Sequence, residues 1–371
     1  MARNRVIYQS EGLYVSREAT STTTGDHFHL SRVQSANYNF NIARQDINQY
    51  GELARIDSIV IEAPTVALDF SYYVTNGNNE REMGFNVVPS GSGTSVAPQF
   101  VGGHITGGSG KNYFIVTSAE GSDLNDLAGT SGLSGRQCIG IGNAYLTDYS
   151  VEFAVGSIPT ATVSFEAANI RGSNISGTNS GVNPAINTEN GTALNTAVQL
   201  PAPTSETNIV SALRPGDVTV SFGSFGGSGI LGQLGGADGI HLQSASLSIP
   251  LSRSQIQRLG SKFAYARNVD FPVNATISLN GVQNEIGSGS LMELLDSNPK
   301  TDITITVNRP GTTAPAVSYI VRRAQLDSSS VSSSIGSNKT ADFTFSAQIG
   351  GVNDTDDGIT MSGSFTGSVT P

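Results

Sequence analysis

The sequence has no tryptophan, a single cysteine and few charged side chains. Cys138 has no partner within the chain, so a disulfide framework is excluded. Charged residues make up only 13% of the 371 residues, and the formal net charge is −10. Tight binding to nucleic acid needs clustered cations that neutralise phosphates. The basic residues here are scattered, which argues against sequence-specific DNA binding. So little charge also predicts that neighbouring subunits in an assembly cover much of the surface.

Long hydrophobic runs are missing as well. Residues 1–5 are followed by no apolar run resembling a signal peptide, and no segment reaches transmembrane length. We therefore expect a chain that is made and folded in the cytoplasm, with no membrane insertion. An extracellular β-rich binding module is a less favoured alternative, because it would have a secretion signal and, often, aromatic binding platforms.

The sequence contains an internal repeat at two offsets. One stretch returns 209 residues later, and a second, residues 144–167, returns 180 residues later as 324–347 with ten of 24 positions identical. The first match pairs Gln34-Ser35-Ala36, Arg44, Ile47 and Gly51 with Gln243-Ser244-Ala245, Arg253, Ile256 and Gly260. Two matches in the same order indicate a duplicated domain whose first copy contains 29 extra residues, the difference between the offsets. Fusing two copies halves the number of chains that close a ring.

Apolar residues alternate with polar ones in many segments, as in strands with one buried face. Examples are 66–70 and 163–167 in the first copy, and 275–279 and 343–347 in the second. Helical patterns are scarce. The best lies at 288–296, with weaker ones at 80–85 and 122–128. The predicted fold class is mainly β, with two tandem β-sandwich or barrel domains, each with a short flanking helix.

Composition sets the expected boundaries. Residues 1–170 form copy one, with a Gly/Ser-rich loop insertion at about 89–111, and residues 216–371 form copy two. The segment 171–215 is rich in Gly, Ser, Asn and Pro and cannot bury enough apolar surface to fold alone. It is either disordered or an extended arm along a neighbouring subunit.

Motifs for catalysis or ligand binding are weak. His27 and His29 would share one face of a strand, but no third metal ligand is near them in sequence. The run Gly107 to Lys111 resembles a phosphate-binding loop superficially, but its spacing fails and Asn112 replaces the required Ser or Thr. We expect no catalytic residue, no cofactor site and no metal site, and hence no enzyme.

Six residues repeated between the copies are the candidates for structural roles. Arg44 and Arg253 are matched, and we interpret them as inter-subunit contacts made once per domain. We therefore predict that Arg253→Ala weakens assembly more than domain stability. The glycines of both copies are expected in turns that need permissive backbone angles, namely Gly51, Gly260, Gly156 and Gly336.

The sequence resembles the tail tube proteins of long-tailed bacteriophages. The resemblance lies in the opening segment 6–16, VIYQSEGLYVS, and in the block 30–40, LSRVQSANYNF, continuing through Arg44-Gln45-Asp46 and Gly51 to 64–66. It extends over both copies outside 171–215.

The resemblance implies a β-sandwich with a flanking helix, whose strands join between subunits into a closed inner barrel of stacked rings. With two fused domains, three chains would form a pseudo-sixfold ring, and an acidic lumen would conduct DNA at ejection. The implied partners are further copies of the chain and other tail proteins: tape measure, terminator, baseplate and, as an option, sheath. The implied location is the virion tail. Another tail component, such as a terminator, sheath or baseplate protein, is the alternative.

Overall fold

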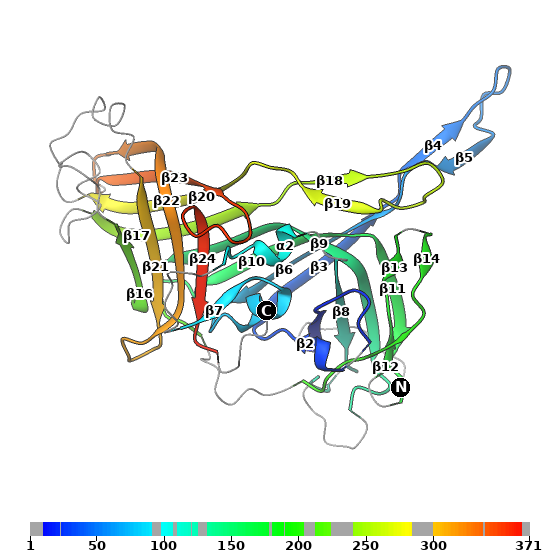
Figure 1. Ribbon diagram of the computed structural model, residues 1–371, viewed down its shortest axis with the longest axis horizontal. Coiled ribbons are helices and arrows are strands. Elements are labelled where there is room, and N and C mark those ends of the chain that lie inside the picture. The colour runs from blue at the N-terminus through cyan, green and yellow to red at the C-terminus, as the bar shows by residue number, and fades with distance from the viewer. Residues whose placement is uncertain are drawn as a thin grey trace.

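The computed structural model describes residues 10–22, 24–90, 98–106, 110–119, 121–124, 132–177, 180–188, 190–203, 212–223, 240–283, 300–336 and 338–365. The chain is mainly β, which confirms the predicted fold class (Figure 1). In the described residues the helices are short: α1 (Asn78–Met83), α2 (Gly102–Ile105) and two 3-10 turns, at Thr24–Asp26 and Pro215–Asp217.

The first half of the chain folds as two sheets that share one long strand. Its strands are β1 (Glu11–Ser16), β2 (His27–His29), β3 (Val33–Asn41), β4 (Arg44–Ile47), β5 (Asp57–Val60), β6 (Thr65–Tyr73), β7 (Val87–Pro89), β8 (Lys111–Thr117), β9 (Gln137–Ala154), β10 (Thr160–Ala167) and β11 (Asn169–Asn174). One sheet has the order β3-β6-β10-β9, and the other has β2-β1-β8-β9-β11. The 18-residue β9 therefore crosses from one sheet into the other.

The second half repeats this strand order. Its strands are β16 (Val218–Phe222), β17 (Ile240–Pro250), β18 (Arg253–Ile256), β19 (Ala266–Val269), β20 (Val273–Gln283), β21 (Thr301–Asn308), β22 (Pro315–Ser332), β23 (Thr340–Ile349) and β24 (Gly358–Gly363). Here β17-β20-β23-β22 form one sheet and β16-β21-β22-β24 the other, and the 18-residue β22 crosses between them. Each strand of the β3-β6-β10-β9 sheet thus has a counterpart: β3 with β17, β6 with β20, β9 with β22, and β10 with β23.

The two halves are joined by strand pairing. The second part of β9 pairs antiparallel with β17, so one sheet of eight strands runs through the molecule in the order β3-β6-β10-β9-β17-β20-β23-β22. Side chains alternate across this sheet, and those on the inner face are buried in strands away from its two edges, such as β6, β10 and β23. Most buried apolar residues of both halves form one contiguous cluster, and a second, smaller cluster lies in the first half.

The segment 171–215 lies on the first half of the same chain over its described residues. β11 extends the sheet beside β9, and four short strands follow: β12 (Ser180–Val182), β13 (Ile186–Asn187), β14 (Thr192–Ala193) and β15 (Ala197–Gln199). Gly142 allows this packing, because a Cβ there would lie 2.4 Å from the carbonyl oxygen of Pro184. Val198 and Leu200 are fully buried. The segment gains the apolar burial that its own composition cannot supply from the domain beneath it.

Part of the 89–111 insertion connects the two halves. The backbone N–H of Phe100 donates to the carbonyl of Ile359 at 2.7 Å, and the Phe100 ring is fully buried. The side-chain amide of Gln99 donates to the carbonyl oxygen of Asp354 at 2.8 Å. β7 lies parallel to β24. The described part of this glycine-rich insertion therefore packs between the halves.

The predicted helices have different outcomes. Helix α1 begins at Asn78 and ends at Met83, so it overlaps the expected 80–85 and lies slightly earlier. The expected helix at 288–296 lies outside the described residues, as does most of 122–128.

A buried carboxyl group lies where the halves meet. The side chain of Glu80 is buried, and the Tyr72 hydroxyl donates to its Oε1 at 2.9 Å. The Tyr149 hydroxyl lies 3.5 Å from the same oxygen and 2.8 Å from the hydroxyl of Tyr319, which belongs to the second half. Burial raises the pKa of Glu80 above its ordinary value. Burial therefore favours the neutral acid more in the folded chain than in the unfolded one.

We expect Glu80→Gln to raise the free energy of unfolding at neutral pH by about 1 kcal/mol. Because the native pKa of Glu80 is raised, its stabilising contribution is fully present below the unfolded-state pKa and is lost as pH rises through the native pKa. The amide stays neutral at every pH, so the variant should lose this pH dependence. Urea unfolding between about pH 4 and pH 7.5 measures it. The exposed Glu152→Gln is the control. Equal pH slopes for wild type and Glu80→Gln would contradict the expectation.

Candidate subunit interface

The junction between the halves is a ladder of strand pairs with a defined register. Ser244 of β17 lies opposite Ala154 of β9, and the pairing continues without a shift to Pro250 opposite Asp148. Its inner side chains are all buried, among them Val151, Leu247 and Ile249. The chain thus contains one complete domain-to-domain contact, made by the end of β9 and by β17.

The hairpin β18–β19 adds side-chain contacts to this junction. Arg253 donates from Nε to the carbonyl of Leu146 at 2.9 Å and from a terminal nitrogen to the carbonyl of His104 at 2.8 Å. Its guanidinium also lies 5.4 Å from the centre of the Tyr145 ring. Arg267 forms an ion pair with Glu166. The second half therefore holds the first with a docked hairpin as well as with a strand.

The two ends of the eight-stranded sheet are open in the described chain. β3 pairs only with β6, and residues 325–332 of β22 pair only with β23. The inner-face side chains at both edges are exposed, whereas their counterparts inside the chain are buried. Tyr38 is 42% and Phe40 61% exposed, where the matched Leu247 and Ile249 are fully buried. Val331 is 52% exposed, against 1% for the matched Val151.

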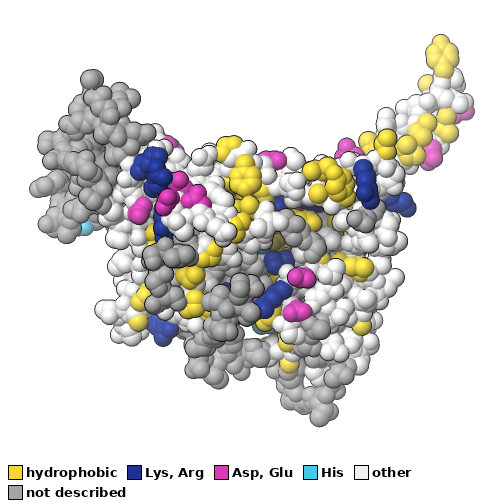
Figure 2. Space-filling view, in the orientation of Figure 1, with side chains coloured by type: hydrophobic (Ala, Val, Ile, Leu, Met, Phe, Trp, Pro, Cys, Tyr) yellow, Lys and Arg dark blue, Asp and Glu magenta, His cyan; other side chains and the backbone are white. Residues whose placement is uncertain are grey.

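The hairpin β4–β5 projects from the body of the molecule beside the β3 edge (Figure 1). It is the counterpart of β18–β19 but has no half-domain beneath it. Apolar side chains lie exposed along it to the tip (Figure 2), namely Ile47, Tyr50, Leu53, Ile56, Ile59 and Val60. Exposed apolar surface of this extent is typical of an interaction site.

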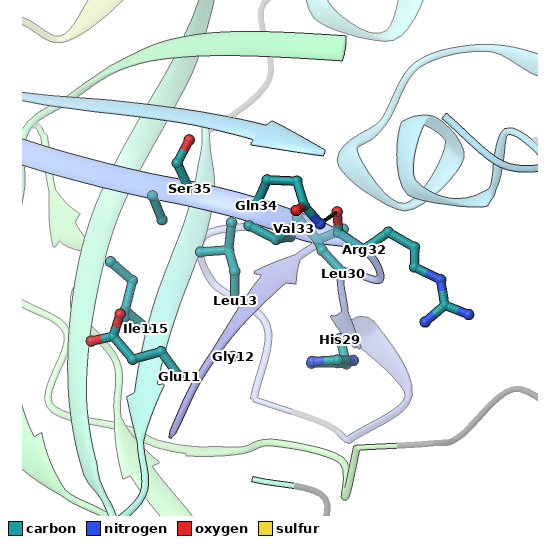
Figure 3. Close-up of a pocket in the computed structure, with 11 residues that line it drawn as sticks. Glu11, Gly12, Leu13, His29, Leu30, Arg32, Val33, Gln34, Ser35 and Ile115 are labelled. Atoms are coloured by element: carbon teal, nitrogen blue, oxygen red, sulfur yellow. Dashed lines mark hydrogen bonds between the residues drawn. The ribbon is translucent and has the colours of Figure 1, made fainter. Parts of the chain in front are cut away.

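A pocket of about 160 Å³ adjoins the β3 edge (Figure 3). Leu13 and Ile115 form part of its apolar wall, and Gln34, Ser35 and Ala36 of β3 form its rim. His29 also lines it, and burial lowers the pKa of His29 to about 4. The corresponding place in the second half, beside Gln243-Ser244-Ala245, is lined by the end of β9 as well. The pocket at β3 therefore lacks the strand end that lines its counterpart in the second half.

The outer face of the eight-stranded sheet is polar and anionic. Its strand residues are mostly Ser, Thr and Asn, none of them buried. They include no Lys or Arg among the described strands, and the acidic members are Asp69, Asp148, Glu152, Glu166, Asp327 and Asp342. Partial burial raises the pKa of Asp148. A surface of small polar groups and carboxylates offers phosphates no cation to bind.

The structure places the two matched arginines in different surroundings and the four repeated glycines in turns. Arg253 joins the two halves of one chain, so its observed contacts are intramolecular, and an inter-subunit role for it stays a prediction. Arg44 lies exposed at the start of the projecting hairpin. The four repeated glycines all lie in turns with positive φ: 95° at Gly51, 86° at Gly260, 84° at Gly156 and 88° at Gly336.

The described ranges also bear on metal binding and membrane spanning. No group of three or more His, Cys, Asp or Glu side chains is arranged to hold a metal ion there. His27 is buried and packs edge-on against Phe114, and His29 contacts Tyr14. Among the helices that the structure describes, none has the length and hydropathy to cross a membrane.

The sequence did not predict the two open edges of the sheet or its polar face. Each had a signal: Tyr38 and Phe40 match buried residues of the second copy, and Ser and Asn occupy every second position of several strands. The exposure of these positions depends on which strand lies beside which, and the sequence does not state that order.

Comparisons with known proteins give little similarity. No family model matches the chain, and no curated protein matches it. Among solved structures, the chain is similar to one from the cryo-EM structure of the anti-feeding prophage baseplate, 6-fold symmetrised. The match covers 40% of this chain and 93% of that one, with 11% identity and a TM-score of 0.24. Similarity at this level identifies no family.

Proposed function

We propose that the protein is a structural virion protein, a subunit of a phage tail tube, with no catalytic activity. The observation that supports this best is the eight-stranded sheet, open at both edges, with a polar outer face that bears carboxylates and no Lys or Arg. Subunits that join edge to edge leave no exposed strand edge and close a barrel. With the polar face inward, DNA phosphates meet a wall of like charge and pass without adhering.

The repeated strand order supports an internal duplication and therefore a ring of three chains. Each chain supplies two equivalent domains already joined by the β9–β17 ladder, and three chains give six domains related by pseudo-sixfold symmetry.

The exposed hairpin tips support stacking of rings. Tyr50 and Leu259 occupy matched tips, and both are fully exposed, although β18–β19 is docked and β4–β5 is not. Docking on a lateral neighbour therefore leaves a tip free for the next ring.

Electron microscopy of the purified protein, with the mass of its rings, tests the proposal. We expect annular particles of three chains that stack into tubes. Rings of six chains would refute the stoichiometry. Single rings that never stack would favour the alternative, a tail terminator, and a chain that stays monomeric at every concentration would overturn the proposal. Passage of DNA and contact with tape-measure or baseplate proteins are parts of the same proposal.

Reversing charge on the polar face should make assembled tubes retain DNA. We expect Glu152→Lys to increase retention of short double-stranded DNA at least tenfold at low salt, because lysines repeated around a lumen neutralise phosphates, and to lose this gain as salt rises. Co-sedimentation of tubes assembled with labelled DNA measures the effect. Asp356→Lys, on the exposed loop between β23 and β24 and outside the strands of this face, is the control. Equal retention by both variants would indicate that the face does not line the lumen.

A further inference from the structure

The contact within the chain is a template for the contact between chains. Position by position, β17 corresponds to β3 with an offset of 209, and the end of β9 corresponds to the end of β22 with an offset of 180. Inside the chain, β9 and β17 form a ladder. The corresponding strands, β22 and β3, are the two open edges of the sheet. The two open edges therefore correspond to the two strands that pair within the chain.

We propose that the β3 edge binds the β22 edge of a second copy of this chain, in the register of the β9–β17 ladder. The inference rests on the proposed function and names its interface. Transferring the observed pairs places Asn37 opposite Ser332, Tyr38 opposite Val331 and Asn39 opposite Ser330. Tyr38, Phe40 and Val331 then join a continuous apolar layer, as Leu247, Ile249 and Val151 do within the chain.

The pocket beside β3 fits the same partner. In the template, Phe153, Ala154 and Val155 line the pocket against β17, and the N–H of Val155 donates to the carbonyl of Gln243 at 2.9 Å. The matched residue of a second copy is Ile335, which is fully exposed in the single chain. Ile335 would lie at the mouth of the pocket that Leu13, Val33 and Ile115 line, and its N–H would reach the carbonyl of Gln34 (Figure 3).

Only some of the β18–β19 hairpin contacts have counterparts in the proposed contact between chains. Arg253 donates to the carbonyl of Leu146, and the matched pair across chains is Arg44 and Leu326. The ion pair does not transfer, because Arg267 and Glu166 correspond to Ser58 and Ser346. The contact between chains thus keeps the strand ladder and the arginine but lacks the ion pair. We expect it to be weaker than the contact within the chain, as suits subunits that fold before they assemble.

The ladder also identifies which facing pairs approach most closely. Hydrogen bonds from Val155 N to the Gln243 carbonyl and from Leu251 N to the Thr147 carbonyl make the odd-numbered residues of β9 the hydrogen-bonded ones. The even-numbered pairs, such as Glu152 with Ser246, are non-hydrogen-bonded, where Cα atoms are closest at about 4.5 Å. That spacing suits a disulfide. The matched pair between chains is Asn37 with Ser332.

Disulfide trapping tests the register. The double variant Asn37→Cys/Ser332→Cys should form intermolecular disulfides in most chains under mild oxidation, giving linked species up to trimers on a non-reducing gel. Both edges belong to opposite ends of one sheet, so any such bond joins two chains. Glu152→Cys/Ser246→Cys, the matched pair within the chain, is the positive control and should form an intramolecular disulfide. Cys138 should not interfere, because it is buried and burial raises its pKa to about 12.

An off-register variant makes the result specific. Asn41→Cys/Ser332→Cys places the thiols four residues apart along the proposed ladder, beyond the reach of a disulfide. Linkage below about a tenth of chains is expected for it. Equal linkage in both double variants, or none in either while the positive control closes, would overturn the proposed interface. Trapped chains that form open polymers without tubes would keep the interface and refute the tube function. Three-chain tubes that form no trapped disulfide would keep the tube function and refute the proposed interface.

Discussion

Ser329→Pro should abolish ring formation and leave the chain folded. Ser329 is matched to Tyr149, whose N–H points toward β17 in the intramolecular ladder, so the Ser329 N–H points away from β23 at the open edge. Proline removes that donor, and its ring occupies the space of an incoming strand. Proline is tolerated on edge strands where the N–H faces solvent. The substitution therefore acts on the contact with a second chain and spares the ladder with β23.

Sedimentation and electron microscopy, together with circular dichroism, measure this effect. We expect Ser329→Pro to stay monomeric at concentrations at which wild type is fully assembled, a shift of at least a hundredfold in the assembly concentration, with an unchanged β spectrum. Ser329→Ala is the matched control, because it removes the same hydroxyl and keeps the N–H. Its rings should equal those of wild type. Rings of normal size from the proline variant would show that this edge does not join subunits.

The sequence predicted the class of the fold and the matched positions well. Alternation at 66–70 and 343–347 indicated strands because one face of each is buried, and these became parts of β6 and β23. Which strands lie side by side was not predictable, because alternation reports a buried face and not the neighbour in the sheet. The eight-stranded sheet depends on β9 pairing with β17, a contact across nearly a hundred residues.

Composition was a poorer guide to the Gly- and Ser-rich segments. Residues 180–203 look like a linker because they contain few large apolar side chains, yet Val198 and Leu200 are buried against the first half. The insertion at 89–111 is similar: Phe100 is its anchor, and its partner Ile359 comes from the end of the chain. In both segments one or two apolar residues suffice because the surface that receives them is already folded.

Alanine substitutions of the two matched arginines should affect assembly and stability differently. Arg253→Ala should lower the free energy of unfolding by about 2–3 kcal/mol, because it leaves the buried carbonyls of Leu146 and His104 without their charged donor. This geometry moves the main effect expected for Arg253 from assembly to stability. Arg44 lies on the exposed β4–β5 hairpin. Arg44→Ala should therefore change stability by less than about 0.5 kcal/mol.

Arg44→Ala should weaken assembly more than Arg253→Ala does, the opposite of their expected order in stability. If Arg44 donates to the Leu326 carbonyl of a second copy, its loss should raise the concentration needed for rings about 10- to 100-fold, equivalent to about 1.4–2.7 kcal/mol. Urea unfolding of dissociated chains and sedimentation of assembled ones, on both variants, measure the two quantities separately. Arg44→Ala that assembles at the wild-type concentration, or that unfolds as easily as Arg253→Ala, would break the correspondence between the contact within the chain and the contact between chains. The opposite responses of two matched residues would establish it, since the duplicated positions differ chiefly in whether their partner belongs to the same polypeptide.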